Sequence, residues 1–395
     1  MQKYILFTIF SAIFIVFVGM GIIVPILPIY ATELRASGFD LGVIMAGFAL
    51  SGGLLQPFVG SLSDRHGKKG FLITGLFIFG LTGYTYTMAS SVTHLIIIRI
   101  FHGAGSAMIV PMAMAYVSEV STGRNIGKNM AMLNISIFIG IGAGPLLGGF
   151  FLDFWGMNSA FYAMALLSLL SAVFVAIVLP GRDNLAVQEK KDPMLAVFKR
   201  MLHGRRVMGI LLSRMATMII MVPTFAFLPI LMKNYMTASG MEIGMVIASR
   251  TIVNAVFQLP FGNLTDRWNK NRLLFIGSTI ISIGIFTVPF ADRFIILLLL
   301  FALIGLGEAI SWPTLGALAA EEGHIYGQGA IMGVFNTAMS AGLFVGAMGV
   351  GAMVDVMGIA WAFYLVALLL FLSTIAAAVM IRPGKGDIGS VMKNR

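Results

Sequence analysis

Residues 60–69 read GSLSDRHGKK, and residues 262–267 repeat the beginning of this stretch as GNLTDR. Each copy follows one long apolar run and precedes another, so its acidic and basic side chains fall in a short loop between two hydrophobic segments. Asp266 lies 202 residues after Asp64. A polar loop that recurs in the same setting at this distance predicts a long internal repeat.

The same shift brings further polar, glycine and proline residues into register, which a shared apolar bias would not do. The pairs are Gln56 with Gln258, Gly60 with Gly262, Gly103 with Gly305, Gly105 with Gly307, Pro111 with Pro313, Glu119 with Glu321, Asn134 with Asn336 and Asp153 with Asp355. We therefore expect two similar domains, over residues 1–180 and 207–395. The polar stretch 181–206 is expected to link them on the cytoplasmic side.

The composition excludes a water-soluble protein. The chain has 395 residues, of which 58% are hydrophobic and 11% charged, whereas soluble domains average about 25% charged residues. About 20 apolar residues suffice for a helix to cross a bilayer. Twelve such spans are expected, at about 5–30, 41–62, 70–89, 95–118, 130–152, 159–179, 207–232, 241–262, 272–291, 294–320, 330–353 and 358–381.

These spans predict an all-α membrane protein of two six-helix bundles. Each half has an even number of spans, so the halves are parallel repeats related by a pseudo-two-fold axis along the membrane normal. We count 20 of the 26 Lys and Arg on one side of the membrane, in the termini, the linker and alternate loops. The positive-inside rule makes that side cytoplasmic, so both termini are expected inside the cell (inner) membrane.

The net charge of +10 is thus explained by topology, which disfavours a nucleic-acid partner. The chain has no Cys, and its five His are not spaced as metal ligands, so no metal and no cofactor are expected. Walker loops, HExxH and nucleophile elbows are missing from the sequence, so an enzyme is not expected either.

Three stretches resemble the signature motifs of the major facilitator superfamily: residues 60–69, RIFHGAG at 99–105 and GIGAGPLLGG at 140–149. The third resembles the motif associated with drug:proton antiporters. Residues 19–28, GMGIIVPILP, resemble the first helix of bacterial twelve-helix tetracycline and multidrug exporters. The resemblance covers the whole chain. It implies a monomeric secondary transporter that works by alternating access, with a small molecule and protons as its partners in the lipid bilayer.

The resemblance also implies a conformational latch in the first motif, which ties the cytoplasmic ends of helices together in the outward-facing state. A basic loop that only sets topology is the alternative, but it would not need Asp64. In the second half Asn269 and Asn271 replace the expected Gly and Lys, so a weaker latch is expected there. The predicted latch residues are Gly60, Asp64, Arg65, Gly67, Lys68, Lys69, Asp266 and Arg267.

The glycines of the third motif predict a close helix contact. Gly140, Gly144 and Gly148 recur every fourth residue and share one helix face, where small residues let backbones approach. Together with Pro145 and Gly149 they predict a hinge in the first half. Ordinary helix packing is the alternative, and it does not exclude a hinge.

Ionisable side chains inside spans are costly and therefore indicate function. Glu308 is the predicted proton carrier, and Arg250 is its candidate partner; a purely structural pair is the alternative. Arg99 resembles the motif arginine that the family associates with proton coupling. His102 is its titratable neighbour, which could instead be a neutral hydrogen-bonding group.

Arg250, Asn254 and Gln258 recur every fourth residue and form one polar face, which we expect to line a central substrate cavity. The full predicted set of cavity residues is Arg250, Asn254, Gln258, Gln56, Asn134, Asn336, Phe225, Trp312 and Phe344. Three intramembrane arginines, at 99, 214 and 250, outnumber Glu308. This excess favours neutral, zwitterionic or anionic substrates over cations.

The sequence therefore predicts a proton-coupled efflux antiporter of small amphipathic compounds. A transporter of a specific anionic metabolite or lipid, anchored by Arg250, is the alternative. A membrane sensor that transports nothing is a more remote alternative, since such a protein would be expected to carry a long cytoplasmic tail.

Overall fold

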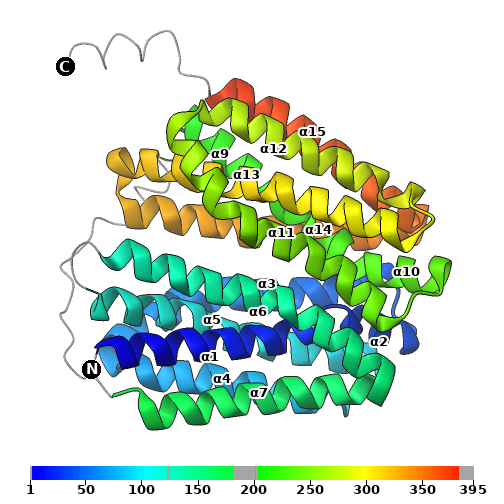
Figure 1. Ribbon diagram of the computed structural model, residues 1–395, viewed down its shortest axis with the longest axis horizontal. Coiled ribbons are helices and arrows are strands. Elements are labelled where there is room, and N and C mark those ends of the chain that lie inside the picture. The colour runs from blue at the N-terminus through cyan, green and yellow to red at the C-terminus, as the bar shows by residue number, and fades with distance from the viewer. Residues whose placement is uncertain (1, 122–124, 181–200, 202, 382–395) are drawn as a thin grey trace.

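A computed structural model describes residues 2–121, 125–180, 201 and 203–381. Every regular element in these ranges is a helix, and the helices form two bundles that lie against each other (Figure 1). The N bundle contains α1 (Gln2–Ile23), α2 (Ile26–Glu33), α3 (Gly38–His66), α4 (Lys68–Tyr86), α5 (Val92–Val120), α6 (Asn125–Trp155) and α7 (Met157–Val178). The C bundle contains α9 (Arg205–Ile219), η1 (Pro223–Phe227), α10 (Leu228–Met236), α11 (Gly240–Arg267), α12 (Lys270–Thr287), η2 (Val288–Phe290), α13 (Phe294–Tyr326), α14 (Gln328–Met357) and α15 (Ile359–Ile381).

Eleven helical segments of the described residues are long and apolar enough to cross a membrane. The expected span at 70–89 is α4, which is not among the eleven because two Lys at its start and many Gly, Thr and Tyr lower the mean hydropathy of its 19 residues. α4 nevertheless packs along α5 and α7, as a twelfth helix of the same bundles. The expected fold class is confirmed, with a helix count close to twelve. The predicted linker falls mostly outside the described residues, so the domain boundary stays a prediction.

Two of the spanning segments are interrupted at prolines, which lack an N–H donor and clash with the preceding turn. Pro25 stands at the break between α1 and α2, within a segment that we expected to be one helix. Pro223 opens η1, a five-residue π-helical turn between α9 and α10. Turns of this kind often occur at functional sites.

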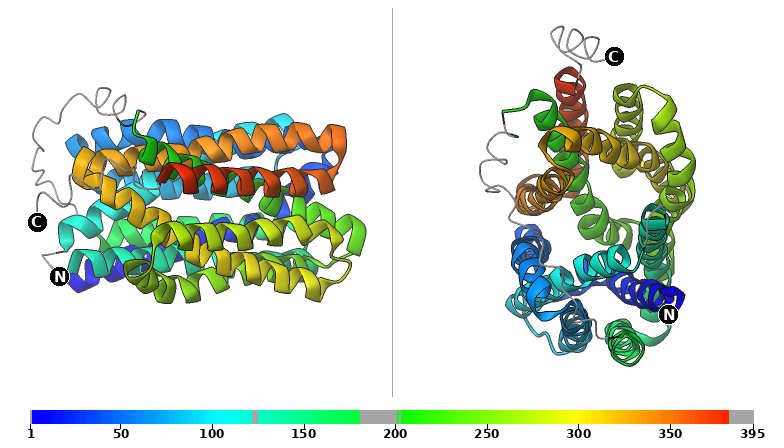
Figure 2. Two further views of the ribbon diagram at one scale, coloured as in Figure 1. Left: turned by 90° about the horizontal axis from the view of Figure 1, so that it is seen from above. Right: turned by 90° about the vertical axis from the view of Figure 1, so that its left-hand side faces the viewer.

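The bundles have two distinct ends, which we call near and far. The helices α1, α4 and α9 begin at the near end, whereas α3 and α11 begin at the far end (Figure 1 and Figure 2). The starts of α3 and α11 carry the same capping box. The Ser37 hydroxyl accepts the Asp40 N–H, and Ser239 does the same for Glu242, 202 residues later. The repeat thus extends to the way these helices begin.

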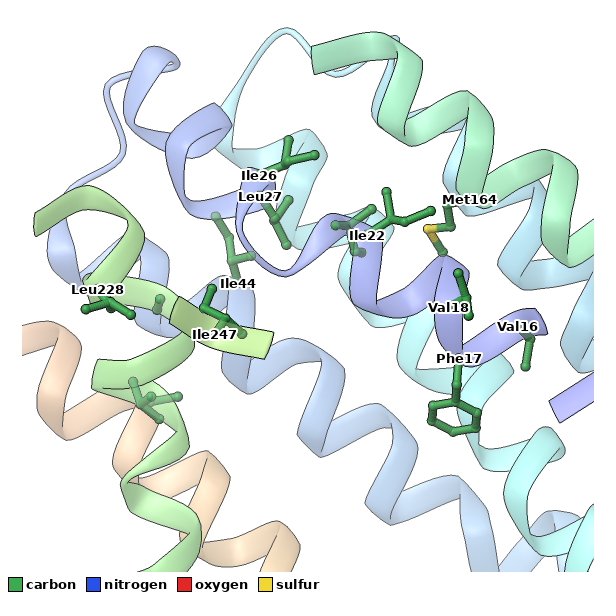
Figure 3. Packing of buried hydrophobic residues seen from close by; sticks show 14 of the residues in the cluster. Val16, Phe17, Val18, Ile22, Ile26, Leu27, Ile44, Met164, Leu228 and Ile247 are labelled. Carbon is green, nitrogen blue, oxygen red and sulfur yellow. The ribbon is translucent and has the colours of Figure 1, made fainter. Parts of the chain in front are cut away.

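The two bundles share one apolar core. Helix pairs α3–α14 and α6–α11 join them, and one cluster of buried side chains runs through both bundles. Figure 3 shows part of it, with Ile44 of the N bundle near Ile247 of the C bundle and Leu228 of the C bundle further along. A second cluster around Val207 and Leu315 is confined to the near end of the C bundle. Apolar packing therefore holds the bundles together along the α3–α14 and α6–α11 seams.

Candidate functional site

A buried ion pair joins α11 and α13 inside the C bundle. Arg250 Nε donates to Glu308 Oε2 at 3.0 Å and Nη2 donates to Oε1, so the contact is bidentate. The two residues are only 2% and 3% exposed. Gly305 allows the close approach, because a Cβ there would lie 2.2 Å from the Arg250 carbonyl oxygen. Two charge-assisted bonds in such a setting fix the pair strongly in orientation.

The remaining partners of Arg250 come from the π-helical turn η1 and from Met221, two residues before it. Thr224 Oγ1 accepts a hydrogen bond from Nη1 at 2.6 Å, while its own proton can go to the Ile220 carbonyl at 2.9 Å. Met221 Sδ lies 3.3 Å from Nη2, and the Phe225 ring centre lies 5.4 Å from the guanidinium carbon. Each guanidinium nitrogen of Arg250 therefore has a partner in this state.

Replacing Thr224 with Val should destabilise the protein, because Arg250 Nη1 would lose its acceptor inside the bundle. A buried donor left unsatisfied costs about 1–3 kcal/mol. Thermal unfolding of the purified protein in detergent would measure the loss. Thr287→Val is the matched control, since that hydroxyl bonds only carbonyls of its own helix. Equal loss in both variants would contradict a supporting role for Thr224.

The other predicted cavity residues differ in their surroundings. Asn254, one turn nearer to the near end than Arg250, is 2% exposed, and neither of its amide atoms has a partner among the described residues. Gln258 and Gln56 are partly exposed, and Asn134 and Asn336 are exposed. On the polar face of α11, each guanidinium nitrogen of Arg250 therefore has a partner, whereas the amide group of Asn254 has none among the described residues.

Two of the three predicted aromatic residues lie against arginines. Phe225 packs near Arg250, as described above, and the ring of Trp312 lies 5.8 Å from the guanidinium carbon of Arg214. Trp312 also contacts Phe138 across the bundles, at 5.9 Å between ring centres. Phe344 instead packs at the edge of the shared apolar core. The aromatic residues thus do not form one wall.

Arg99 and His102 lie in the N bundle, whereas Glu308 lies in the C bundle. Arg99 Nε donates to a backbone carbonyl of α3 at 3.3 Å, and its guanidinium carbon lies 4.5 Å from the Phe48 ring centre. His102 is fully buried, with Nδ1 at 3.2 Å from the Tyr86 hydroxyl. The structure therefore does not gather the predicted proton-coupling residues in one place.

The first-motif loop makes its described contacts within the N bundle. Lys68 pairs with Glu119 of α5, and Lys69 Nζ donates to a carbonyl of α7 at 2.8 Å. Gly67 has a φ of 89°, a backbone conformation that favours glycine, and it lets α3 end and α4 begin at once. A Cβ at Gly60 would meet open space. These contacts brace one bundle and do not cross to the other.

The charged centre of the predicted latch cannot be placed. The side chains of Asp64, Arg65 and Asp266 lie outside the described part of the structure, and Arg267 is exposed. In the second half, Asn269 accepts the Arg272 N–H at 3.1 Å and so caps α12. The latch assignment therefore stays a prediction.

Basic side chains brace the near end of the C bundle as well. Arg206 pairs with both Glu321 and Glu322, and Lys270 Nζ lies 3.0 Å from Glu321. These pairs tie the starts of α9 and α12 to the end of α13. Like the contacts of Lys68 and Lys69, they stay within one bundle.

The glycines of the third motif face two different helices that pack against α6. A Cβ at Gly144 would lie 2.4 Å from the backbone of Gly21, and Gly140 and Gly148 likewise face α1. Gly149 faces the other bundle, where a Cβ would lie 2.2 Å from the carbonyl of Gly240. Pro145 also faces α11, opposite Gly244. Backbones therefore approach closely on both faces, and whether α6 bends there as a hinge stays a prediction.

Two carboxylates at the far end reach across the bundles, and we call these contacts the far-end clamps. Asp153, at the end of α6, accepts the first two N–H groups of α11 at 2.7 and 2.8 Å. Asp355, at the end of α14, accepts the first two N–H groups of α3 at 2.5 and 2.8 Å. Carboxylates are favourable at helix N-termini, which carry free N–H groups and partial positive charge.

The far-end clamps indicate which end of the molecule is closed. Both depend on contact between bundles, and close backbone packing supports them: a Cβ at Gly42 would lie 2.2 Å from the Ala347 carbonyl, and one at Gly244 equally close to the Pro145 carbonyl. The near-end ion pairs among the described side chains, in contrast, join helices of the same bundle. The structure is therefore clamped at the far end.

The sequence did not reveal the role of the two clamp carboxylates or of Thr224. The repeat placed Asp153 and Asp355 in register but suggested no role, because their partners are backbone N–H groups that leave no side-chain signal. Thr224 carried no signal at all, since only the π-helical turn brings it to Arg250.

The Major Facilitator Superfamily model matches residues 9–235 and 208–390 of the chain. An uncharacterized MFS-type transporter of Methanocaldococcus jannaschii is 31% identical over 340 residues, which cover 85% of this chain and 87% of that protein. Multidrug resistance protein 2 of Bacillus subtilis is 28% identical over 361 residues, 86% of each chain.

A solved structure shares the fold. A bacterial homologue of the human lysosomal transporter Spinster, in an inward-facing and occupied conformation, matches with a TM-score of 0.83 at 13% sequence identity. The match covers 98% of each chain.

Proposed function

The chain belongs to the Major Facilitator Superfamily, and on that premise we propose that it exports small amphipathic compounds from the cell in exchange for protons. The observation that carries this proposal is the Arg250–Glu308 pair. It places one carboxylate, enclosed among membrane-spanning helices, where protonation would cancel the charge that holds its partner. Similarity to a multidrug resistance protein supports export of small compounds.

The proposed orientation puts the near end in the cytoplasm, with both chain termini, because the basic loops gather there. The protein is proposed to act as a monomer in the cell membrane. The clamped far end then makes this the cytoplasm-facing state. A compound would enter from the cytoplasm while Glu308 is ionised and paired with Arg250.

Protons are exchanged for the compound because Glu308 must be protonated before the empty protein returns to the cytoplasm-facing state. After the bundles rock and the far end opens, the compound leaves and Glu308 takes a proton from outside. The neutral carboxyl returns to the cytoplasm-facing state and gives up its proton as the next compound binds. The near-end ion pairs would keep each bundle rigid during rocking, because each joins helices of one bundle.

Transport of a specific anionic metabolite or lipid anchored by Arg250 is less well supported. Its guanidinium already has Glu308, Thr224 and Met221 as partners. An incoming anion would have to displace the carboxylate from a bidentate contact, which is costly for a buried pair.

Proton exchange can be tested in everted membrane vesicles with an acidic interior that is reported by a pH-sensitive dye. Adding an exported aromatic compound should dissipate the pH gradient, because each molecule that enters the vesicle releases protons. Vesicles without the protein give the baseline. Uptake that proceeds with no effect on the gradient, and that persists after the gradient is collapsed, would indicate a uniporter instead.

A further inference from the structure

Arg214 is a charged group without a charged partner within bonding distance among the described residues. It lies in the interior of α9, and its guanidinium contacts Met339 Sδ at 3.1 Å and the Phe335 ring at 4.8 Å from the guanidinium carbon. Its Nε is buried and donates to no acceptor in the described part of the chain. Arginine inside a membrane is normally paired or bound to backbone carbonyls. Arg214 therefore has unused donor capacity.

Trp312 places a second unused donor at the same point. Its indole Nε1 is buried and also has no acceptor among the described residues. The ring lies 5.8 Å from the guanidinium carbon of Arg214, and it stands one helical turn from Glu308 towards the near end. Two N–H donors from α9 and α13 thus share one site. Native proteins rarely leave buried donors without an acceptor.

The local charge points to the kind of acceptor that is missing. Glu308 uses both carboxylate oxygens for Arg250, although it is close enough to Arg214 to interact electrostatically. Two guanidinium groups thus share one carboxylate, which leaves one positive charge uncompensated inside the bundle. Neutral acceptors would satisfy the N–H groups but not this charge, whereas an acidic group would satisfy both.

We propose that Arg214 and Trp312 anchor the acidic group of the transported compound. The rings of Phe335 and Phe138 flank this pair and offer apolar surface to an aromatic body. This inference rests on the proposed export of small amphipathic compounds and narrows their class to aromatic anions and zwitterions. The anchor is distinct from Arg250, which remains with the coupling carboxylate.

Binding of two probes of the same shape tests the anchor without any transport step. 2-Naphthoate carries a carboxylate, and 2-naphthamide replaces it with a neutral amide on the same ring system. Equilibrium dialysis against the full chain in nanodiscs measures both, and empty nanodiscs correct for partition into lipid. We expect the acid to bind about tenfold more tightly than the amide, which corresponds to about 1.4 kcal/mol.

Variants of the anchor should remove this preference. Arg214→Gln should bind the acid about as weakly as the amide, and Arg214→Lys should keep part of the difference. Trp312→Phe keeps an aromatic ring but loses the indole N–H, so it should weaken the preference and provides a second test if Arg214→Gln folds poorly. Arg293→Gln, at an exposed far-end arginine, should leave the preference unchanged.

The outcomes separate the anchor from the proposed exchange. A wild-type protein that binds acid and amide alike, or neither, would overturn the anchor, and so would an Arg214→Gln variant that keeps the preference. Binding of the acid with no proton movement in vesicles would instead contradict the exchange and leave the anchor standing.

Discussion

Glu308→Gln is expected to abolish proton-driven transport and to leave downhill exchange of the compound running. Gln is nearly isosteric with Glu and can still accept from Arg250, but it cannot take up and release a proton. For one-for-one exchange, a gradient of one pH unit can sustain about a tenfold gradient of a neutral compound, since 1.4 kcal/mol is a factor of ten. In proteoliposomes the variant should reach no accumulation, while counterflow of labelled compound continues.

A double variant separates proton carriage from a structural role of the pair. Arg250→Gln/Glu308→Gln removes both charges, and replacing a whole buried pair is tolerated far better than breaking it. If the pair were only structural, the double variant would regain driven transport. Glu242→Gln, at a capping carboxylate on α11, is the matched control and should transport normally. Driven transport in Glu308→Gln would refute the assignment of the proton carrier.

Removing both far-end clamps should shift the protein towards a state open at the far end. Asp153→Ala/Asp355→Ala deletes four hydrogen bonds between the bundles. A helix-capping side chain contributes about 1 kcal/mol, so losing two should change the ratio of closed to open states by about 30-fold. Transport should slow as well, because the cytoplasm-facing state would be less populated.

The absence of native Cys makes this shift directly measurable. Spin labels on Met88→Cys and Phe290→Cys, which are 66% and 65% exposed at the far ends of the two bundles, would report their separation. Double electron–electron resonance should show longer distances in the clamp variant. Asp40→Ala/Glu242→Ala is the matched control, because these acids cap the same two helices without crossing between bundles. A similar lengthening in the control would assign the effect to helix fraying.

The fold was largely predictable because bilayer crossing imposes a coarse rule on composition. Long apolar runs and basic loops recur whatever the packing details, so Arg250 and Gly305 could be placed within the eighth and tenth expected spans from the sequence alone. The break at Pro25 and the π-helical turn at Pro223 were not foreseen. Proline in a membrane helix can be accommodated by neighbours, and its effect depends on packing that one span does not reveal.

The candidate site was predictable only where its residues are charged. Glu308 and Arg250 stand out because charge is rare inside spans, and the structure does pair them. Arg99 and His102 stand out equally, but their described contacts are with Ile44, Phe48 and Tyr86 of their own bundle. Spacing along one helix does not specify which neighbour a side chain faces. In the sequence Arg214 is only one of three intramembrane arginines, and the contacts of its guanidinium are what single it out.

The two far-end clamps are equivalent under exchange of the two halves, so the same contacts could also form between two separate chains. Each half contributes one acid at a helix end and one helix start that receives it: Asp153 and Gly38 come from the first half, and Asp355 and Gly240 from the second. Two identical copies of either half, placed about a two-fold axis along the membrane normal, would therefore form both contacts at once. A surface that is complementary to itself in this way is an isologous dimer interface. A half-length polypeptide of six helices thus carries, in one acid and one helix start, all that a homodimer would need to close its far end.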